Sequence, residues 1–276
     1  MLAGVAAPAS ARGMAAPAAT EAVPAAAGSP SPSGSPSPSG SPAPSGSPGG
    51  SPSPLPWPSS PPTPSPTPTP RPQPLPRCTY EDVITRDRDP EDWATTFLDT
   101  IYRLPTSYVP ADLVRTNVAG GGSVRRHVAA DLRAMVRAAA TAGAPVKIVS
   151  AYRSYGTQVY DFAYWVRVSG LASALLGSAR PGHSEHQLGT TIDVTSLGAG
   201  LPWLMWDWGT TPAGRWMRLN AWRYGFVMSY PPKGSPAKTC YRYEPWHFRY
   251  VGKQMAATVR ASGLTLREYL WRNRAP

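Results

Sequence analysis

The chain has 276 residues and a formal net charge of +11, with 35 prolines but only two cysteines and four histidines. This length allows one domain with a sizeable core. The charge attracts polyanions in general, but the basic residues are scattered singly and no nucleic-acid-binding motif is present, so we expect no nucleic-acid partner. An anionic bacterial wall or a membrane surface fits the charge equally well, and charge alone does not decide.

Residues 1–76 differ in composition from the rest of the chain. They contain 23 of the 35 prolines and only three charged residues, Arg12, Glu21 and Arg71. Such a segment cannot bury enough apolar area to offset the entropy of ordering. We therefore predict a disordered Ala/Pro/Ser-rich tail and spacer over residues 1–76, followed by one domain over residues 77–276.

The Ser-Pro and Thr-Pro repeats of this tail favour an extended polyproline conformation, which suits a spacer. A ligand for proline-binding domains is the alternative. The first 27 residues make a poor export signal, because they lack a basic start and a long apolar run. No stretch approaches the apolar length of a transmembrane helix, so we expect no transmembrane segment.

The two cysteines, Cys78 and Cys240, flank most of the predicted domain. We predict a disulfide between them, which would suit an oxidising compartment and therefore a secreted or cell-wall-associated, extracytoplasmic protein. Two unrelated buried thiols are the alternative. We expect the domain to be a monomer.

The first part of the domain shows two helical patterns and one strand. Apolar residues recur at roughly helical spacing from Tyr80 to Leu104, and we interpret Trp93, Phe97, Leu98 and Ile101 as core. Ser123 is the predicted N-cap of a helix that runs to about Ala142, where Gly143 ends it. Its apolar stripe comprises Val124, Val128, Leu132, Met135, Val136 and Ala139.

A strand and a helix follow in close succession. The β-branched residues of 146–152 predict a buried strand, and a helix is predicted from about Tyr155 to Val168. Arg153 and Gln158 lie where the strand passes into the helix, a common place for functional side chains.

The second part of the domain contains further strands and helices. Residues 190–195 predict a short strand with Asp193 on the face opposite Ile192 and Val194. Thr211 and Pro212 predict the start of a helix that reaches about Tyr224. The remaining predicted elements are strands at 226–229 and 246–251 and a final helix that begins with the capping-box pair Thr265 and Glu268.

Three histidines and three carboxylates gather in two short motifs. His186, Asp193 and His247 form a candidate three-ligand zinc set that leaves a fourth position open for water, as in catalytic zinc sites. Glu244, three residues before His247, is a candidate general base. The spacing does not itself specify zinc, and the helical HExxH signature is absent.

The fourth histidine, His127, lies outside these motifs. We interpret His127 as a solvated surface histidine.

These residues carry a family resemblance. The runs Ser184-Glu-His-Gln-Leu-Gly-Thr-Thr-Ile-Asp193 and Glu244-Pro-Trp-His-Phe-Arg-Tyr-Val251 resemble the VanY-type zinc D-alanyl-D-alanine carboxypeptidases, whose pattern is Ser-x-His-x6-Asp with a later Glu-x-Trp-His. The block Ser150-Ala-Tyr-Arg-Ser154 with Gln158 resembles the segment that the family carries ahead of its metal motif. The resemblance extends over about residues 108–252.

The resemblance implies a role for each matching position. It implies one zinc ion per chain, held by His186, Asp193 and His247, with Glu244 as the catalytic base. Arg153 would bind substrate and stabilise negative charge on the carbonyl oxygen, an interaction that is stronger in the transition state than in the ground state. The implied substrate contacts are Arg153, Gln158 and Ser184.

Some of these residues have a simpler alternative role. Arg153 could close the strand end through a salt bridge, and Glu244 could serve in capping or in an ion pair. We interpret His183 and Glu185, which flank the first ligand motif, as outer or loop-shaping groups rather than ligands.

Together these observations predict an α+β domain in which a small antiparallel sheet carries the zinc site and helices cover the other face. The predicted reaction is hydrolysis of the C-terminal D-Ala-D-Ala bond of peptidoglycan stem peptides. An LD-carboxypeptidase or an endopeptidase acting on the same stem peptide is the first alternative. A non-catalytic wall-binding module is the second, and nucleic-acid binding driven by charge is the third.

Overall fold

A computed structural model of the chain describes residues 73–273. Apart from its last four residues, the predicted tail over residues 1–76 therefore lies outside the described residues. Within the described range, no helix combines the length and the apolar character that crossing a bilayer requires.

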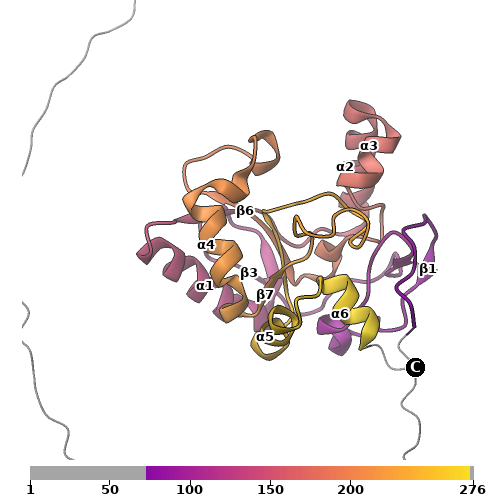
Figure 1. Cartoon of the computed structure of the whole chain (residues 1–276), viewed down its shortest axis with the longest axis horizontal. Helices are drawn as coiled ribbons and strands as arrows, with labels where there is room; N and C mark the ends of the chain where they lie inside the picture. The colour runs from indigo at the N-terminus through magenta and orange to yellow at the C-terminus, as the bar shows by residue number, and fades with distance from the viewer. Residues whose placement is uncertain (1–72, 274–276) are drawn as a thin grey trace, which may run out of the picture. The chain divides into compact units, whose positions relative to one another are not determined.

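A four-stranded sheet with the strand order β5-β6-β8-β7 forms the centre of the fold (Figure 1). Each pair of neighbouring strands in it is antiparallel. The strands are β5 (Val146–Ser150), β6 (Thr191–Ser196), β7 (Phe226–Met228) and β8 (His247–Tyr250). The four strands predicted in this part of the sequence, and the small antiparallel sheet, are confirmed.

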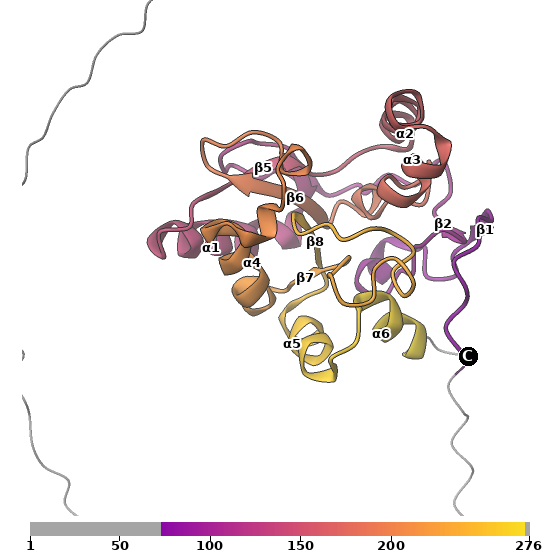
Figure 2. The same cartoon turned by 45° about the horizontal axis from the view of Figure 1, so that its top comes forward.

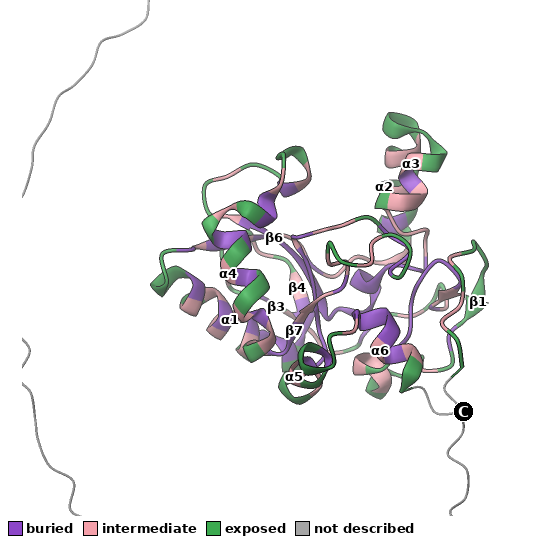
Figure 3. Cartoon of the chain, viewed as in Figure 1, coloured by how far each residue is buried: buried purple, intermediate pink, exposed green. Residues whose placement is uncertain are grey.

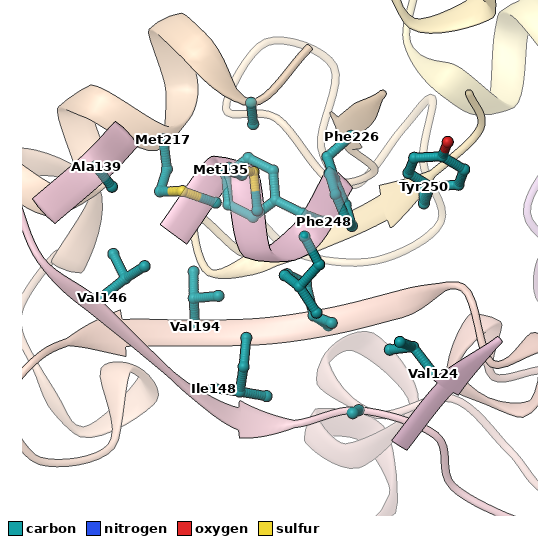
Figure 4. Close-up of a cluster of buried hydrophobic side chains, with 14 of the residues drawn as sticks. Val124, Met135, Ala139, Val146, Ile148, Val194, Met217, Phe226, Phe248 and Tyr250 are labelled. Atoms are coloured by element: carbon teal, nitrogen blue, oxygen red, sulfur yellow. The ribbon is translucent and has the colours of Figure 1, made fainter. Parts of the chain in front are cut away.

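One face of this sheet is apolar and packs against helices. Val194 of β6 and Phe248 of β8 are buried beside Met135 of α1 (Arg126–Thr141) and Met217 of α4 (Pro212–Asn220), as Figure 4 shows. Because side chains alternate along a strand, Asp193 and His247 project from the opposite face. Burial of each large apolar side chain contributes about 1.5–3 kcal/mol, so the core holds the strands that carry the polar residues.

The remaining helices surround the sheet on different sides. In Figure 2, α1 and α4 lie on one side, whereas α2 and α3 form a separate hairpin. Figure 3 shows that the outward faces of these helices are exposed and the central strands are buried. The other α-helices are α2 (Tyr155–Ser169), α3 (Leu171–Gly177), α5 (Lys253–Ser262) and α6 (Leu266–Arg272).

Short 3-10 helices connect several of these elements. They are η1 (Pro90–Ala94), η2 (Glu185–Leu188), η3 (Pro202–Leu204), η4 (Trp208–Thr210) and η5 (Ala221–Tyr224). The predicted helix from Thr211 to Tyr224 is thus α4 continued by η5, and Gly225 ends it in the left-handed conformation. The helix predicted at 155–168 is confirmed as α2, whereas α3 and α5 were not predicted.

The start of α1 was predicted incorrectly. Ser123 is not its N-cap but lies in β4 (Ser123–Arg125), which pairs with β3 (Leu113–Arg115). The helix begins at Arg126 without a side-chain cap. Pairing with a strand eight residues away along the chain overrides the local capping preference of serine. Four residues of the predicted stripe, Val128, Leu132, Met135 and Ala139, are buried in α1 as expected.

The helical spacing from Tyr80 to Leu104 does not produce an α-helix. This segment contains β1 (Val83–Ile84), η1 and β2 (Tyr102–Arg103), and β1 pairs with β2 in parallel. The core interpretation nevertheless holds for Phe97, Leu98 and Ile101, which are buried, and Trp93 is partly buried against the main core.

The beginning and the end of the domain are fastened together. Cys78 and Cys240 form a disulfide with Cα atoms 5.3 Å apart, which confirms the predicted bridge. Asp99 accepts hydrogen bonds from Nη2 and Nε of Arg267 in α6 at 2.7 and 2.9 Å. We call these four residues the clasp. The predicted capping box of Thr265 and Glu268 is also present at the start of α6.

Candidate metal centre

The sheet register brings two of the predicted ligands together. Asp193 of β6 stands directly opposite His247 of β8, and its Oδ1 lies 3.1 Å from Nδ1 of His247. His186 lies in η2, just ahead of β6, and its Nε2 is 3.1 Å from Oδ2 of Asp193. All three residues are buried. Residues 61 positions apart in sequence thus meet on one face of the sheet.

A glycine makes the turn between η2 and β6 possible. Gly189 caps η2 in the left-handed conformation with φ 71°. A Cβ atom at this position would lie 2.9 Å from Cδ2 of Leu113 and 3.1 Å from Cγ of Arg125. Glycine removes both the steric conflict and the conformational penalty, so it allows His186 and Asp193 to face each other across this turn.

The outer ring nitrogens of both histidines are engaged elsewhere. Nδ1 of His186 donates to the carbonyl oxygen of Ala151 at 2.6 Å, and Nε2 of His247 donates to Oε2 of Glu185 at 2.9 Å. Each ring therefore turns its other nitrogen toward Asp193. This arrangement of a histidine held through its second nitrogen is typical of metal-ligating histidines.

The geometry and chemistry of these atoms fit a zinc ion. Within residues 73–273, Nε2 of His186 and Oδ1 of Asp193 are buried without a hydrogen-bond partner. The three residues can each offer one ligand atom, all within 4.8 Å of one another. Ligand atoms about 2.0–2.1 Å from a tetrahedral zinc ion lie roughly 3.3 Å apart, and the nitrogen of each histidine lies 3.1 Å from one oxygen of Asp193.

The protonation of the site in the metal-free chain follows from the charges gathered in it. Burial alone would lower the pKa of His247, but the carboxylates of Asp193 and Glu185 outweigh it and raise that pKa to about 10. Burial would raise the pKa of Asp193, yet the two histidines hold it well below its ordinary value. A metal ion would take the place of the proton on His247, as metal binding to histidine generally does.

Glu244 lies beside the ligands rather than among them. It occupies the turn before β8, and its Oε2 is 3.7 Å from Nδ1 of His247. Its backbone N–H donates to Tyr230, and its own carbonyl accepts from the N–H of His247. Burial raises the pKa of Glu244 to about 8 in the metal-free chain, and a nearby dication would lower it.

Arg153 and Ser184 lie next to the three candidate ligands. Nη1 of Arg153 lies 4.0 Å from Oδ2 of Asp193, and Nη2 donates to Oγ of Ser184 at 3.4 Å. Ser184 also accepts from the backbone N–H of His186. Arg153 lies 3.7 Å from Asp161 of α2 through its Nε, so part of the predicted strand-end salt-bridge role is also present. The structure brings both residues to the ligands.

Gln158 occupies a different environment from Arg153 and Ser184. It is buried in α2, and its Nε2 donates to the carbonyl oxygen of Ala179 at 2.7 Å. Its Oε1 is buried without a hydrogen-bond partner in the described part of the chain. The structure therefore shows Gln158 as an anchor for the segment after α3.

The motif residue His183 points away from the ligands. Its Nδ1 donates to the carbonyl oxygen of Asp99, and its Nε2 lies 2.9 Å from Oδ1 of Asp82. Burial lowers the pKa of His183. It joins the ligand loop to the amino-terminal segment, which agrees with its interpretation as a loop-shaping residue. The predicted surface residue His127 is exposed and packs on Trp93.

A buried ion pair behind His247 was not predicted. Glu185 accepts hydrogen bonds from Oγ of Ser229 at 2.6 Å and from Nη1 of Arg249 at 3.1 Å, in addition to that from His247. Arg249 is completely buried and donates to the carbonyl oxygens of Trp93, Ala94 and Thr96. Although burial opposes ionisation, Arg249 and His247 lower the pKa of Glu185 to about 2.

Comparisons with known proteins identify the family of this chain. The family model described as "VanY: D-alanyl-D-alanine carboxypeptidase" matches residues 121–253. A putative carboxypeptidase, YodJ of Bacillus subtilis, is 39% identical over 175 residues, which cover 61% of this chain. The match spans 63% of the length of YodJ, slightly less than two thirds.

Two solved structures extend the comparison to the fold. The LdcB LD-carboxypeptidase is 34% identical, with a TM-score of 0.61, and the match covers 69% of this chain and 95% of that one. A vancomycin-resistance D,D-pentapeptidase VanY in complex with Zn(II) is 28% identical, with a TM-score of 0.54. That match covers 64% of this chain and 99% of the pentapeptidase chain.

Proposed function

Because the chain belongs to the VanY family of D-alanyl-D-alanine carboxypeptidases, we propose that it is a zinc-dependent peptidase of peptidoglycan stem peptides. The proposed reaction is hydrolysis of the C-terminal D-Ala-D-Ala bond. The observation that carries this proposal is the pairing of Asp193 with His247 in the sheet, with His186 and the partly buried Glu244 beside them.

Three residues of the chain would hold one zinc ion: His186, Asp193 and His247. When bound, zinc polarises the scissile carbonyl and makes a nucleophile available near neutral pH. Glu185 and Ala151 fix the two rings from behind through the hydrogen bonds described above. The solved VanY pentapeptidase, which contains Zn(II), supports this choice of metal.

Glu244 would move the proton during hydrolysis. Its carboxylate lies next to the ligands but makes no close ligand-type contact, so it can accept a proton from the attacking water and pass it to the leaving amine. A non-catalytic wall-binding module would not need a partly buried acid in this position. For the same reason, we favour catalysis over a binding role and over nucleic-acid binding.

Arg153 would act on the substrate's negative charge. Its guanidinium group is partly exposed and lies 4.0 Å from Asp193, so it can contact a carboxylate or a developing oxyanion next to the ligands. Ser184 supports Arg153 and is retained as a proposed substrate contact. The proposed contact of Gln158 is limited to its Oε1, because its amide nitrogen already binds Ala179.

The alternative function, cleavage of an L,D bond, is supported by the similarity to a solved LD-carboxypeptidase. The LdcB LD-carboxypeptidase is 34% identical to this chain over 95% of its own length. Cleavage of an L,D bond, or endopeptidase cleavage within the stem, would use the same arrangement of ligands and base. The terminal bond of the substrate must therefore be varied in the decisive assay.

We also propose an extracytoplasmic location, secreted or associated with the cell wall, with residues 1–76 as a disordered spacer and 77–276 as the catalytic domain. The disulfide between Cys78 and Cys240 supports an oxidising compartment. The tail composition supports a spacer.

The test is release of D-alanine by the full chain from two synthetic stem peptides. One is a pentapeptide ending in D-Ala-D-Ala and the other a tetrapeptide ending in an L,D bond. Zinc-loaded protein, chelated protein, the Glu244→Gln variant and a control Glu91→Gln variant at an exposed acid would be compared. We expect Glu244→Gln to retain zinc but lose about 100- to 10,000-fold in turnover.

Each outcome of this assay separates the alternatives. Zinc-dependent release from the pentapeptide supports the proposed function, and preference for the tetrapeptide assigns the LD-carboxypeptidase. Full activity of Glu244→Gln contradicts the role of this residue. Absence of bound zinc, together with inactivity on both peptides, would favour the binding module.

A further inference from the structure

The loop between β6 and α4 exposes an unusual group of apolar side chains. It extends beyond the end of β6 and beyond α4 in Figure 1, and much of it is exposed in Figure 3. The exposed fractions are 55% for Leu197, 41% for Leu201, 76% for Leu204, 36% for Met205 and 101% for Trp206. Scattered single exposed apolar residues are normal, but a group of this kind marks an interaction site.

The base of this loop is ordered, so the exposed side chains are held outward. Pro202 is buried at the start of η3, and Trp203 packs edge-on against Trp246 with ring centroids 6.1 Å apart. Oδ1 of Asp207 accepts from the backbone N–H of Gly209 at 2.8 Å. The backbone N–H of Leu197 donates to the carbonyl oxygen of Pro145. Both ends of the loop are therefore fixed to the domain.

The sequence that follows the loop is rich in basic residues, whereas the loop itself is uncharged. From Val194 to Trp206 the sequence has no charged residue, and Asp207 is the one acid between Val194 and Tyr243. The basic residues in the same stretch are Arg215, Arg218, Arg223, Lys233, Lys238 and Arg242.

Two of these cations are close to the loop along the fold. Arg215 and Arg218 are exposed on α4, which starts six residues after Trp206. A third cation, Lys147 of β5, is the cross-strand partner of Thr195, two residues before Leu197. An apolar tip bordered by cations complements a surface that is apolar inside and anionic outside.

We propose that the loop of residues 197–206 docks the protein on an anionic lipid bilayer. Trp206 and Leu204 enter the boundary between headgroups and acyl chains, and Arg215, Arg218 and Lys147 lie near lipid phosphates. Tryptophan is favoured at this boundary, and binding there scales with buried apolar area and attraction to anionic lipids. A wall glycan would require charged, hydroxyl or amide side chains for hydrogen bonds beside an aromatic ring, and residues 197–206 contain none of these.

This docking would orient the metal centre as well as attach the protein. Trp203 of the loop contacts Trp246, which directly precedes the ligand His247. The loop and the ligands thus share one rigid support, so docking would hold the centre at a fixed height above the lipid surface. The proposal concerns attachment and does not depend on the proposed catalytic activity.

The experiment is co-sedimentation of the full chain with vesicles. Vesicles of phosphatidylcholine containing phosphatidylglycerol would be compared with pure phosphatidylcholine vesicles, at low and at high salt. The test variant is Leu204→Ser with Trp206→Ser. The matched control is Tyr160→Ser with Leu171→Ser, because these two residues are 79% and 56% exposed on the α2–α3 hairpin.

We expect binding to anionic vesicles to fall at least about 10-fold in the test variant and to stay within about twofold in the control. High salt should weaken binding of the parent chain to anionic vesicles, because it screens the attraction between basic side chains and lipid phosphates. Circular dichroism and zinc binding would show that the test variant is folded.

Three results would overturn the proposal. The first is no binding of the parent to anionic vesicles, and the second is equal binding by the parent and the test variant. The third is retained vesicle binding with selective loss of binding to purified peptidoglycan, which would assign the loop to the wall polymer instead.

Discussion

The metal centre and the Asp99–Arg267 pair of the clasp are both buried and charged, but they use their charges differently. In the clasp, Asp99 accepts from the backbone N–H groups of Ile101 and Tyr102 through Oδ1 and from Arg267 through Oδ2. In the metal centre, Oδ1 of Asp193 is also buried, but within residues 73–273 it has no partner with hydrogen-bond geometry and faces Nδ1 of His247 at 3.1 Å. The carboxylate of the clasp is saturated by hydrogen bonds that hold the chain together, whereas the carboxylate of the metal centre keeps an oxygen that can bind a metal ion.

The partners of the two carboxylates also differ in kind. Asp193 faces two histidines, whose rings can exchange a proton for a metal ion. Asp99 faces Arg267, which remains charged under all ordinary conditions. Loss of Asp99 must therefore leave a buried positive charge, whereas loss of Asp193 need not. This comparison predicts that the free energy of unfolding depends mainly on the clasp. The affinity for zinc should depend mainly on the metal centre.

The largest expected effect is the loss of zinc affinity when the candidate ligand Asp193 is replaced. Asp193→Asn should lower zinc affinity by more than about 1,000-fold, because loss of a direct ligand exceeds the 10- to 100-fold typical of outer partners. Isothermal titration with zinc and a competing chelator would measure it. In chelator, the same variant should lose less unfolding free energy than Asp99→Asn. Zinc affinity within about 10-fold of the parent would exclude Asp193 from the ligand set.

The second prediction concerns the clasp. Asp99→Asn should lower the free energy of unfolding by about 3 kcal/mol, because it leaves the guanidinium group of Arg267 buried without a counter-charge. Urea unfolding of the metal-free chain would measure this loss, with Glu91→Gln as the exposed control. Zinc affinity should stay within about threefold of the parent. A large drop in affinity with unchanged stability would contradict the division between the two regions.

The third and smallest effect tests the link between the regions. Glu185→Gln should lower zinc affinity by about 10- to 100-fold, because the carboxylate that fixes the ring of His247 is lost. Competition with a chelator of known affinity would report this. Ser229→Ala, which removes a different partner of the same carboxylate, should have a smaller effect. If both variants bind zinc like the parent, Glu185 does not position His247.

The sequence was sufficient to predict the sheet and the approach of Asp193 to His247. Alternation along β6 and β8 determines which face each side chain occupies, and this is a local property. The same rule could have identified Arg249, which is two residues after His247 and so shares its face. A buried arginine requires an acceptor, but the identity of Glu185 depends on the geometry of η2, which the sequence does not reveal.

Other features depended on competition between local and distant contacts. Residues 93–101 have helical spacing, but Oδ1 of Asp99 binds the backbone N–H groups of Ile101 and Tyr102, which a helix would use differently. Ser123 has a capping preference, yet β4 pairs with β3 instead. In both cases burial was predictable because hydrophobicity determines it, whereas conformation was not.

The disulfide also gives the domain a mechanical property. Cys78 precedes β1, so tension applied to the chain ahead of it would first strain the hydrogen bonds to Gln73 and Pro76 and then pass through the sulfur–sulfur bond to Cys240. The two-residue strands β1 and β2 lie outside this load path. If the proposed spacer connects the domain to a fixed point, tension reaches the chain at Cys240, four residues before Glu244, through a covalent bond.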